Sequence, residues 1–206
     1  MKKTNKGFSL VELIIVIAIM AILAGAIAPA LIRYIDKSRR SNDVTSCKTI
    51  KTAVETALGT EDCYSILTAC GTNATDAIVL RINGNKAYSG TEAVAQGDKS
   101  SGCGVEVATA GSGDVSDVDM TSEDCLDLIA KNIGEKTPKI KYKKVADSSV
   151  LTQKPDCFYV LISNKGTVYV AIGHSGTVPT LTQNSDNSIS ITNAYEIQPN
   201  IQKSYQ

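Results

Sequence analysis

The feature that most constrains this chain is a long apolar run near its N-terminus, GFSLVELIIVIAIMAILAGAIAPALI, which begins at Gly7. Residues 13–32 contain no charged side chain. A helix of about 20 residues spans roughly 30 Å, which is the thickness of the hydrocarbon core of a bilayer. A helix that is apolar on every side for this length predicts contact with lipid or with other apolar helices.

Three interpretations of the run compete. It is a permanent transmembrane helix, a secretory signal peptide preceded by lysines, or a membrane helix that later leaves the bilayer to pack against copies of itself. Residues 24–28, AGAIA, contain two small-x-small patterns of the kind that signal peptidase cleaves. However, Pro29 follows the second pattern directly, and the apolar character continues past both. The sequence therefore disfavours ordinary signal-peptide cleavage.

Glu12 is the one carboxylate inside the run. At the centre of a membrane helix a carboxylate costs on the order of 3 kcal/mol, and near the helix start it costs less because it can reach the interface. Glu12 is thus either tolerated or paired with a cation. A cut between Gly7 and Phe8 would create such a cation, an α-amine four residues before Glu12. In a bundle of staggered copies that pair would fix the register of the helices.

These residues resemble the class III signal of type IV prepilins and type II secretion pseudopilins. The match covers residues 2–35: a short basic leader, Gly7, Phe8, the Ser-Leu-Val triplet at 9–11, Glu12 and an apolar helix. The resemblance implies cleavage after Gly7 by a membrane-embedded prepilin peptidase and N-methylation of Phe8 by the same enzyme. Glu12 corresponds to the register glutamate of the family, and Pro29 to its helix-breaking proline.

Pro29 also has a local effect that follows from its own chemistry. It has no N–H to donate to the carbonyl four residues earlier, and its ring crowds that turn. With Gly25 at that position, the helix is expected to kink or loosen between residues 25 and 29. A simple transmembrane kink and a segment that melts on filament packing are both compatible with this pattern.

The chain is expected to comprise a leader, a membrane and assembly helix, an amphipathic continuation of that helix and a globular head, at residues 1–7, 8–32, 33–58 and 59–206. Apolar residues at 44, 47, 50, 54 and 58 recur at helical spacing, and Gly59 is the expected stop. The lysines of this helix and Asp43 are expected to face water or neighbours. The basic cluster at 33–40 does not orient the helix, because the leader is also basic.

The head reads as a short helix among antiparallel strands. The helix is capped by Thr121 or Ser122, closed by Gly134, and buries Cys125, Leu128, Ile129 and Ile133. Strands are expected at 77–82, before an Asn-Gly turn at 83–84, and at 139–145, 158–162, 167–172, 188–192 and 195–197, with a hairpin turn at 164–166. The predicted fold class is α+β: a long N-terminal helix, half membrane and half amphipathic, packed on an antiparallel meander, pilin-like.

No catalytic constellation is present in the sequence, so the chain is not expected to be an enzyme or to hold a cofactor. Lys+Arg and Asp+Glu both number 21, and this balance predicts no nucleic-acid partner. Asp114, Asp117 and Asp119 are weak calcium candidates whose spacing fits no EF-hand. Six cysteines, Cys47, Cys63, Cys70, Cys103, Cys125 and Cys157, are candidates for disulfides in fifteen connectivities, with buried thiols as the alternative.

The resemblance implies a structural subunit of a type IV pilus or pilus-like filament. A type II secretion pseudopilin and a membrane-tethered extracellular binding domain are the alternatives. The implied partners are copies of the chain and related pilins, the prepilin peptidase, the inner-membrane assembly machinery, and lipid before assembly. The implied location is the cell membrane, with one crossing and a cytoplasmic N-terminus, followed by an extracellular or periplasmic filament.

Overall fold

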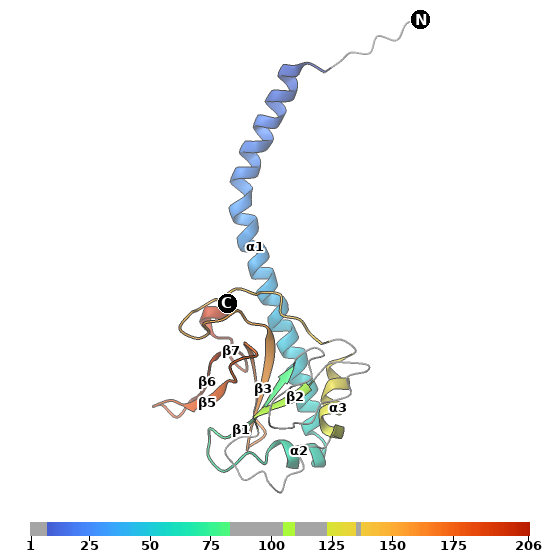
Figure 1. The fold of residues 1–206 in the computed structure, drawn as a ribbon, viewed down its shortest axis with the longest axis vertical. Coiled ribbons are helices and arrows are strands. Elements are labelled where there is room, and N and C mark those ends of the chain that lie inside the picture. The colour runs from blue at the N-terminus through green and yellow to red at the C-terminus, as the bar shows by residue number, and fades with distance from the viewer. Residues whose placement is uncertain (1–7, 83–104, 110–122, 135–136) are drawn as a thin grey trace, which may run out of the picture. The chain divides into compact units, whose positions relative to one another are not determined.

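The computed structural model describes residues 8–82, 105–109, 123–134 and 137–206 of the chain (Figure 1). The chain divides into two compact units, Met1–Arg39 and Arg40–Gln206. Helix α1 (Leu10–Leu58) contributes residues to both. Every other helix and strand described belongs to the second unit, which is the head.

The part of α1 that belongs to the head buries one stripe of small and apolar side chains. Cys47, Ile50 and Val54 are buried as expected, and Val44 and Leu58 pack partly buried against the same core. The helix ends at Leu58, as predicted. The backbone N–H and the hydroxyl of Thr60 both donate to the carbonyl of Ala57 at 3.0 and 2.7 Å, which satisfies one of the last carbonyls of the helix.

The head contains a five-stranded antiparallel sheet in the order β2-β1-β3-β4-β7. Its strands are β1 (Ala77–Ile82), β2 (Val105–Thr109), β3 (Cys157–Ser163), β4 (Val168–Gly173) and β7 (Ala194–Gln198). A long helix on an antiparallel sheet confirms the predicted α+β class. The Asn83–Gly84 turn lies outside the described residues, although β1 and β2 do pair antiparallel.

The strands in the middle of the sheet are covered on both faces. On one face Ile78 and Leu80 join a core with Ile50 of α1 and Ile129 of helix α3 (Glu123–Ile133). On the other face alternate residues of β1 and β3 meet a two-stranded sheet formed by β5 (Thr180–Gln183) and β6 (Ile189–Thr192). Figure 1 shows α1 and α3 on one side of the strands and β5 and β6 on the other. This explains why all six residues of β1, AIVLRI, are buried and why five of them are apolar.

The hairpin between β3 and β4 turns at residues 164–166, as predicted. Gly166 has φ +74°, which favours glycine, and its N–H donates to the Ser163 carbonyl at 2.9 Å. A Cβ at this position would lie 2.9 Å from the ring of Tyr64, which belongs to helix α2 (Glu61–Leu67). The turn thus needs glycine both for its backbone conformation and for its contact with α2.

The α3 helix also agrees with its predicted bounds and face. Cys125, Ile129 and Ile133 are buried and Leu128 is partly buried, while Leu126 joins them in the core. Gly134 follows with φ +122° and donates its N–H to Ala130 at 3.2 Å. The expected caps Thr121 and Ser122 lie outside the described residues.

Two expectations are wrong, and they have one cause. Asp43 does not face water: it is completely buried. Residues 139–145 form no strand, because the N–H groups of Lys141 and Tyr142 donate to the two carboxylate oxygens of Asp43 at 2.7 and 2.9 Å. Successive N–H groups of a regular strand point to opposite edges, so two neighbours cannot share one carboxylate while pairing with another strand.

The hydroxyl of Tyr205 is the third donor to Asp43, at 2.9 Å. Burial raises the pKa of Tyr205, and the charge of Asp43 raises it further, so the hydroxyl keeps its proton and stays a donor. Nearby, the guanidinium of Arg40 lies 4.3 Å from the ring centre of Tyr142 and donates to the Tyr142 hydroxyl and the Gln206 carbonyl at 2.8 and 2.7 Å. One turn of α1 therefore holds the 141–142 segment and the last residues of the chain.

We expect Asp43→Ala to lower the free energy of unfolding of the head by about 3 kcal/mol or more, because three buried donors would lose their acceptor at about 1–3 kcal/mol each. The chain has eight tyrosines and no tryptophan, so urea unfolding of the full chain in a nonionic detergent can be followed by tyrosine fluorescence. Lys48→Ala, an exposed change on the same helix, is the matched control. A loss below about 1 kcal/mol for Asp43→Ala would contradict the role of this carboxylate.

Candidate membrane and assembly segment

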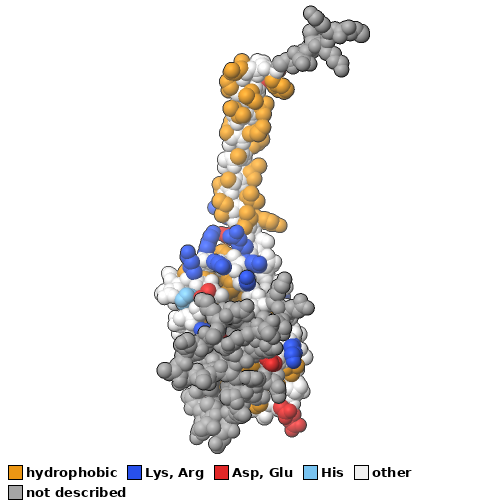
Figure 2. Space-filling model, turned by 45° about the vertical axis from the view of Figure 1, so that its right-hand side comes forward, with side chains coloured by type: hydrophobic (Ala, Val, Ile, Leu, Met, Phe, Trp, Pro, Cys, Tyr) orange, Lys and Arg blue, Asp and Glu red, His pale blue; other side chains and the backbone are white. Residues whose placement is uncertain are grey.

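The N-terminal unit exposes an apolar surface along its helix. Large apolar side chains from Phe8 to Ile35 are solvent-exposed, and Phe8 keeps 86% of its surface exposed. Figure 2 shows these side chains covering the N-terminal part of α1. In the part of the chain that the structure describes, α1 is the one helix long and apolar enough to cross a membrane. Such a surface requires lipid or other apolar helices to cover it.

Glu12 closes the start of the helix. Its carboxylate accepts the backbone N–H of Ser9 at 3.0 Å, and Ser9 directly precedes the first helical residue, Leu10. A glutamate at the third helical position that reaches back to the N-cap N–H is one half of a capping box. The sequence signal for a capping box, Ser-x-x-Glu ahead of an apolar run, lies at residues 9–12. The expectations for Glu12 concern only its charge and do not include this role.

Gly25 and Pro29 lie inside α1, and the helix continues through both. A Cβ at Gly25 would meet no atom of the described residues within 4 Å, so none of their contacts requires a glycine there. Pro29 leaves the Gly25 carbonyl without its usual N–H donor. The kink or local melting inferred from the sequence remains a prediction.

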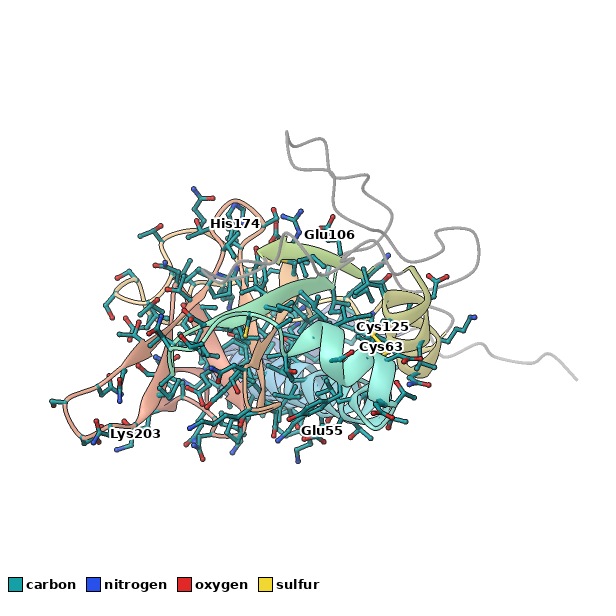
Figure 3. The ribbon with its side chains drawn as sticks, turned by 90° about the horizontal axis from the view of Figure 1, so that it is seen from below. Glu55, Cys63, Glu106, Cys125, His174 and Lys203 are labelled. Atoms are coloured by element: carbon teal, nitrogen blue, oxygen red, sulfur yellow. A yellow bond between two sulfur atoms is a disulfide. The ribbon has the colours of Figure 1, made fainter. Side chains whose placement is uncertain are left out.

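The cysteines combine both alternatives left open by the sequence. Cys63 of α2 and Cys125 of α3 form a disulfide with a Cα–Cα distance of 5.5 Å (Figure 3). It joins two helices on the same side of the head, and the bonded residues are 62 apart in sequence. A bond closing a loop of that size removes about 4 kcal/mol of chain entropy from the unfolded state in the loop-closure account. Cys103 lies outside the described residues.

Three cysteines, Cys47, Cys70 and Cys157, are buried free thiols. Burial raises the pKa of each, and it raises that of Cys157 to about 12 with a further contribution from the charge of Asp156. Cys70 donates to the carbonyl of Asp76 at 3.3 Å. These thiols behave as small core side chains, because the thiolate that would react is strongly disfavoured.

The remaining predicted positions are not tested by the geometry. Gly7 and the calcium candidates Asp114, Asp117 and Asp119 lie outside the described residues. Within the residues that are described, His, Cys, Asp and Glu form no group of three or more suited to a metal. His174 closes a turn after β4, where the N–H of Thr177 donates to its carbonyl at 3.0 Å.

Comparison with known proteins gives matches of limited length. The family model described as the prokaryotic N-terminal methylation motif matches residues 2–28. The chain is 43% identical over 68 residues to the type IV major fimbrial protein FimA of Dichelobacter nodosus, covering 31% of this chain and 44% of that protein. It is 39% identical over 61 residues to the type IV major pilin protein PilA of Myxococcus xanthus, covering 30% and 28%.

Fimbrial protein Q of Moraxella bovis is 50% identical over 54 residues, covering 26% of this chain and 34% of that protein. The chain thus spans less than half the length of the curated relatives it matches. No solved structure matches it significantly.

The N-terminal segment therefore carries the prokaryotic N-terminal methylation motif. Over this segment the chain is similar to type IV pilins and fimbrial proteins, and its long helix and antiparallel sheet are consistent with the pilin-like α+β fold that the resemblance implies.

We expect the described cysteines to differ in how they become accessible to iodoacetamide at pH 8. Cys47, Cys70 and Cys157 should resist alkylation in the native protein and react once it is unfolded without reductant, because burial raises the pKa of each thiol and disfavours the reactive thiolate. For Cys157, whose pKa is raised to about 12, only about one part in 10⁴ is thiolate at that pH. Cys63 and Cys125 should react only after reduction. Peptide mass spectrometry separates the five sites.

The control is Thr49→Cys, which places a thiol at an exposed position of α1 and should label at once. Native labelling of Cys157 as fast as this control would contradict the buried-thiol assignment. Labelling of Cys63 or Cys125 in unfolded, unreduced protein would contradict the disulfide.

Proposed function

We propose that the chain is a structural subunit of a type IV pilus or pilus-like filament. In this proposal it is inserted in the cell membrane with its N-terminus in the cytoplasm, cleaved after Gly7 by a prepilin peptidase and N-methylated at Phe8. The inner-membrane assembly machinery then moves it from lipid into an extracellular or periplasmic filament. The observation that carries the proposal is the start of α1, where one carboxylate precedes the exposed apolar part of the helix, residues 13–35.

The exposed apolar surface at the start of α1 must be covered in the membrane and again in the filament. Before assembly, lipid covers the exposed side chains of residues 8–35 at no cost in apolar exposure. In a filament, the same side chains of neighbouring copies would cover each other, so the transfer exchanges one apolar environment for another. The apolar side chains are covered equally well in both environments, but the carboxylate of Glu12 is not. It is stabilised inside a filament only if a cation is buried beside it.

Cleavage after Gly7 would supply that cation. Glu12 accepts the Ser9 N–H in the uncleaved chain, so its charge is held at the helix start, where a new α-amine on Phe8 would lie. The amine of one subunit and Glu12 of a neighbour would then form a pair that exists only at one stagger of the helices. The proposal thus assigns Glu12 two successive partners.

A type II secretion pseudopilin shares every step of this argument and is the second candidate. The relatives are a major pilin and fimbrial proteins by name, which favours the pilus. A membrane-tethered binding domain would need the membrane helix but not the pairing of Glu12. The Glu12 variants therefore separate the tethered domain from a filament subunit, and the Gly7 variant tests the cleavage site that both share.

The first experiment tests processing. We expect Gly7→Val to leave the uncleaved precursor in the membrane, because a branched side chain would obstruct a peptidase site that accepts glycine. Asn5→Val, in the same leader, is the matched control and should be processed normally. The measurement is the N-terminal mass of the protein expressed with a prepilin peptidase, and normal trimming of Gly7→Val would reject this cleavage site.

The second experiment tests the role of Glu12 with two variants. Glu12→Val removes both the charge and the acceptor for Ser9, whereas Glu12→Gln removes the charge and keeps an acceptor. We expect both variants to be cleaved and retained in the membrane but to give few sheared filaments, because an unpaired buried amine costs on the order of 3–5 kcal/mol per subunit.

Filament yield relative to the unchanged chain is the measurement. Wild-type yield from Glu12→Gln with loss only in Glu12→Val would assign Glu12 to capping alone. Wild-type yield from both would leave Glu12 a tolerated residue. Either result would reject the register pair.

A further inference from the structure

The head contains a cleft of about 550 Å³ that the filament function does not use. A cavity of this size is within the range of small-molecule sites, roughly 300–1,000 Å³. Its described lining comes from three stretches that are far apart in sequence and from the end of β1. The lining residues are Ile82, Thr137, Pro138, Lys139, Ile140, Lys143, Lys154, Pro155, Asp156 and His174.

The cleft depends on the irregular course of residues 139–145, which do not form the expected strand. Because the N–H groups of Lys141 and Tyr142 are held by Asp43, the segment around them runs across the head without joining the sheet. Ile140 and Tyr142 are buried, and Lys139, Lys141 and Lys143 alternate with them on the outside. Two of these lysines therefore lie in the wall of the cleft.

The charge of the lining is positive. The lining contains three lysines, Lys139, Lys143 and Lys154, and one carboxylate, Asp156. The formal net charge of these side chains is therefore 3 − 1 = +2. Among the described residues no carboxylate lies within ion-pair distance of these three ammonium groups. Figure 2 shows basic side chains beside the histidine on this face of the molecule. Converging charges of one sign in a partly enclosed space attract a counter-ion.

Asp156 does not cancel this charge by pairing with a lysine, because its oxygens are already engaged. Oδ1 accepts the backbone N–H of Ser175 and Oδ2 accepts its hydroxyl, both at 2.7 Å. The same carboxylate lies 3.4 Å from Nδ1 of His174. Asp156 thus holds the turn after β4 in place at the rim of the cleft.

His174 is oriented by its neighbours. Its Nδ1 lies 3.1 Å from the carbonyl of Lys154. A carbonyl can only accept, so Nδ1 carries the proton and donates. This leaves Nε2, the other ring nitrogen, for a ligand, and within the described part of the chain nothing is bonded to it.

The rest of the lining is apolar. Ile82, Ile140 and Pro155 are buried side chains that contribute to the wall, with Pro138 half-buried beside them. A fully hydrated inorganic ion would leave this surface without a partner. The lining instead matches a molecule with an anionic group at one end and an apolar body at the other.

We propose that this cleft is a binding site for a small amphipathic anion. Such a molecule has a carboxylate or phosphate group attached to an apolar or aromatic part about the size of one ring. Lys139, Lys143 and Lys154 bind the anionic group, and Ile82, Ile140 and the two prolines contact the body. The described lining residues all belong to the head, so binding can be measured on the unassembled chain.

Titration of the full chain in a nonionic detergent tests the proposal, with calorimetry or NMR shifts as the readout. The probes are phenyl phosphate, benzoate, inorganic phosphate and phenol. Phenyl phosphate or benzoate should bind saturably, and whichever binds tighter identifies the anionic group. Inorganic phosphate and phenol should each bind at least about tenfold more weakly, because each lacks one half of the recognised structure.

The test variant is Lys139→Gln, Lys143→Gln and Lys154→Gln together, which should weaken binding of the better probe at least about tenfold. The matched control, Lys48→Gln, Lys165→Gln and Lys203→Gln, removes the same charge from exposed positions outside the cleft and should bind normally. Urea unfolding of both variants checks that the head is intact.

Absence of saturable binding of both ring-bearing anions up to about 10 mM would overturn the proposal. Equal weakening by the control variant would also overturn it, since the interaction would then be general electrostatics. Because the unassembled chain is used, either result leaves the filament proposal unaffected.

Discussion

The fold of the head depends on one buried carboxylate. Asp43 lies on the helix that forms the spine of the head, and it accepts three hydrogen bonds from two distant parts of the chain. A buried charge without partners would cost several kcal/mol, so the carboxylate is compatible with the core only because all three donors reach it. These hydrogen bonds also position the donors. One turn of α1 therefore fixes the location of the 141–142 segment and of Tyr205.

The consequences extend across one side of the head. Tyr205 packs against Tyr142 and Tyr195, with ring centres 5.9 and 5.3 Å apart. The hydroxyl of Tyr195 accepts the N–H groups of Ala146 and Asp147, each at 2.9 Å. Here the side chains of Tyr195 and Asp43 pair backbone N–H groups of segments that have no regular secondary structure.

Sequence patterns predicted those parts of the structure whose cause is local. The stop of α1 after Leu58, the glycine turn at Gly166 and the apolar stretch of β1 each follow from residues that are neighbours in the chain. Asp43 could not be predicted in this way, because a charged residue on an amphipathic helix normally faces water, and its three donors lie about 100 and 160 residues further on. The α2 helix spans only seven residues, which is too short for a clear helical period. The β5 strand, TLTQ, has a single apolar residue and so shows no alternation, whereas β6, ISIT, has the same length but alternates and was predicted.

The same distinction applies to the two candidate sites. The N-terminal segment is continuous, so its leader, apolar run and carboxylate could be interpreted together before any fold was known. The cleft is assembled from residues at 82, 137–143, 154–156 and 174, and its existence depends on the irregular course of the 139–145 segment. The alternating pattern at 139–145 predicted a strand, and lysines on such a strand would be expected to face solvent. The sequence alone therefore offers no reason to place Lys139 and Lys143 in a cleft.

The disulfide has a further consequence for the integrity of the molecule. A cut of the backbone at any peptide bond between Cys63 and Cys125 produces two fragments, one carrying all of α1 and the other carrying strands β3 to β7. The bond keeps these fragments joined as one covalent molecule, and β1 remains paired with β3 if the cut falls after it. A subunit nicked in this stretch would therefore keep its anchor attached to its sheet until a reductant separates them.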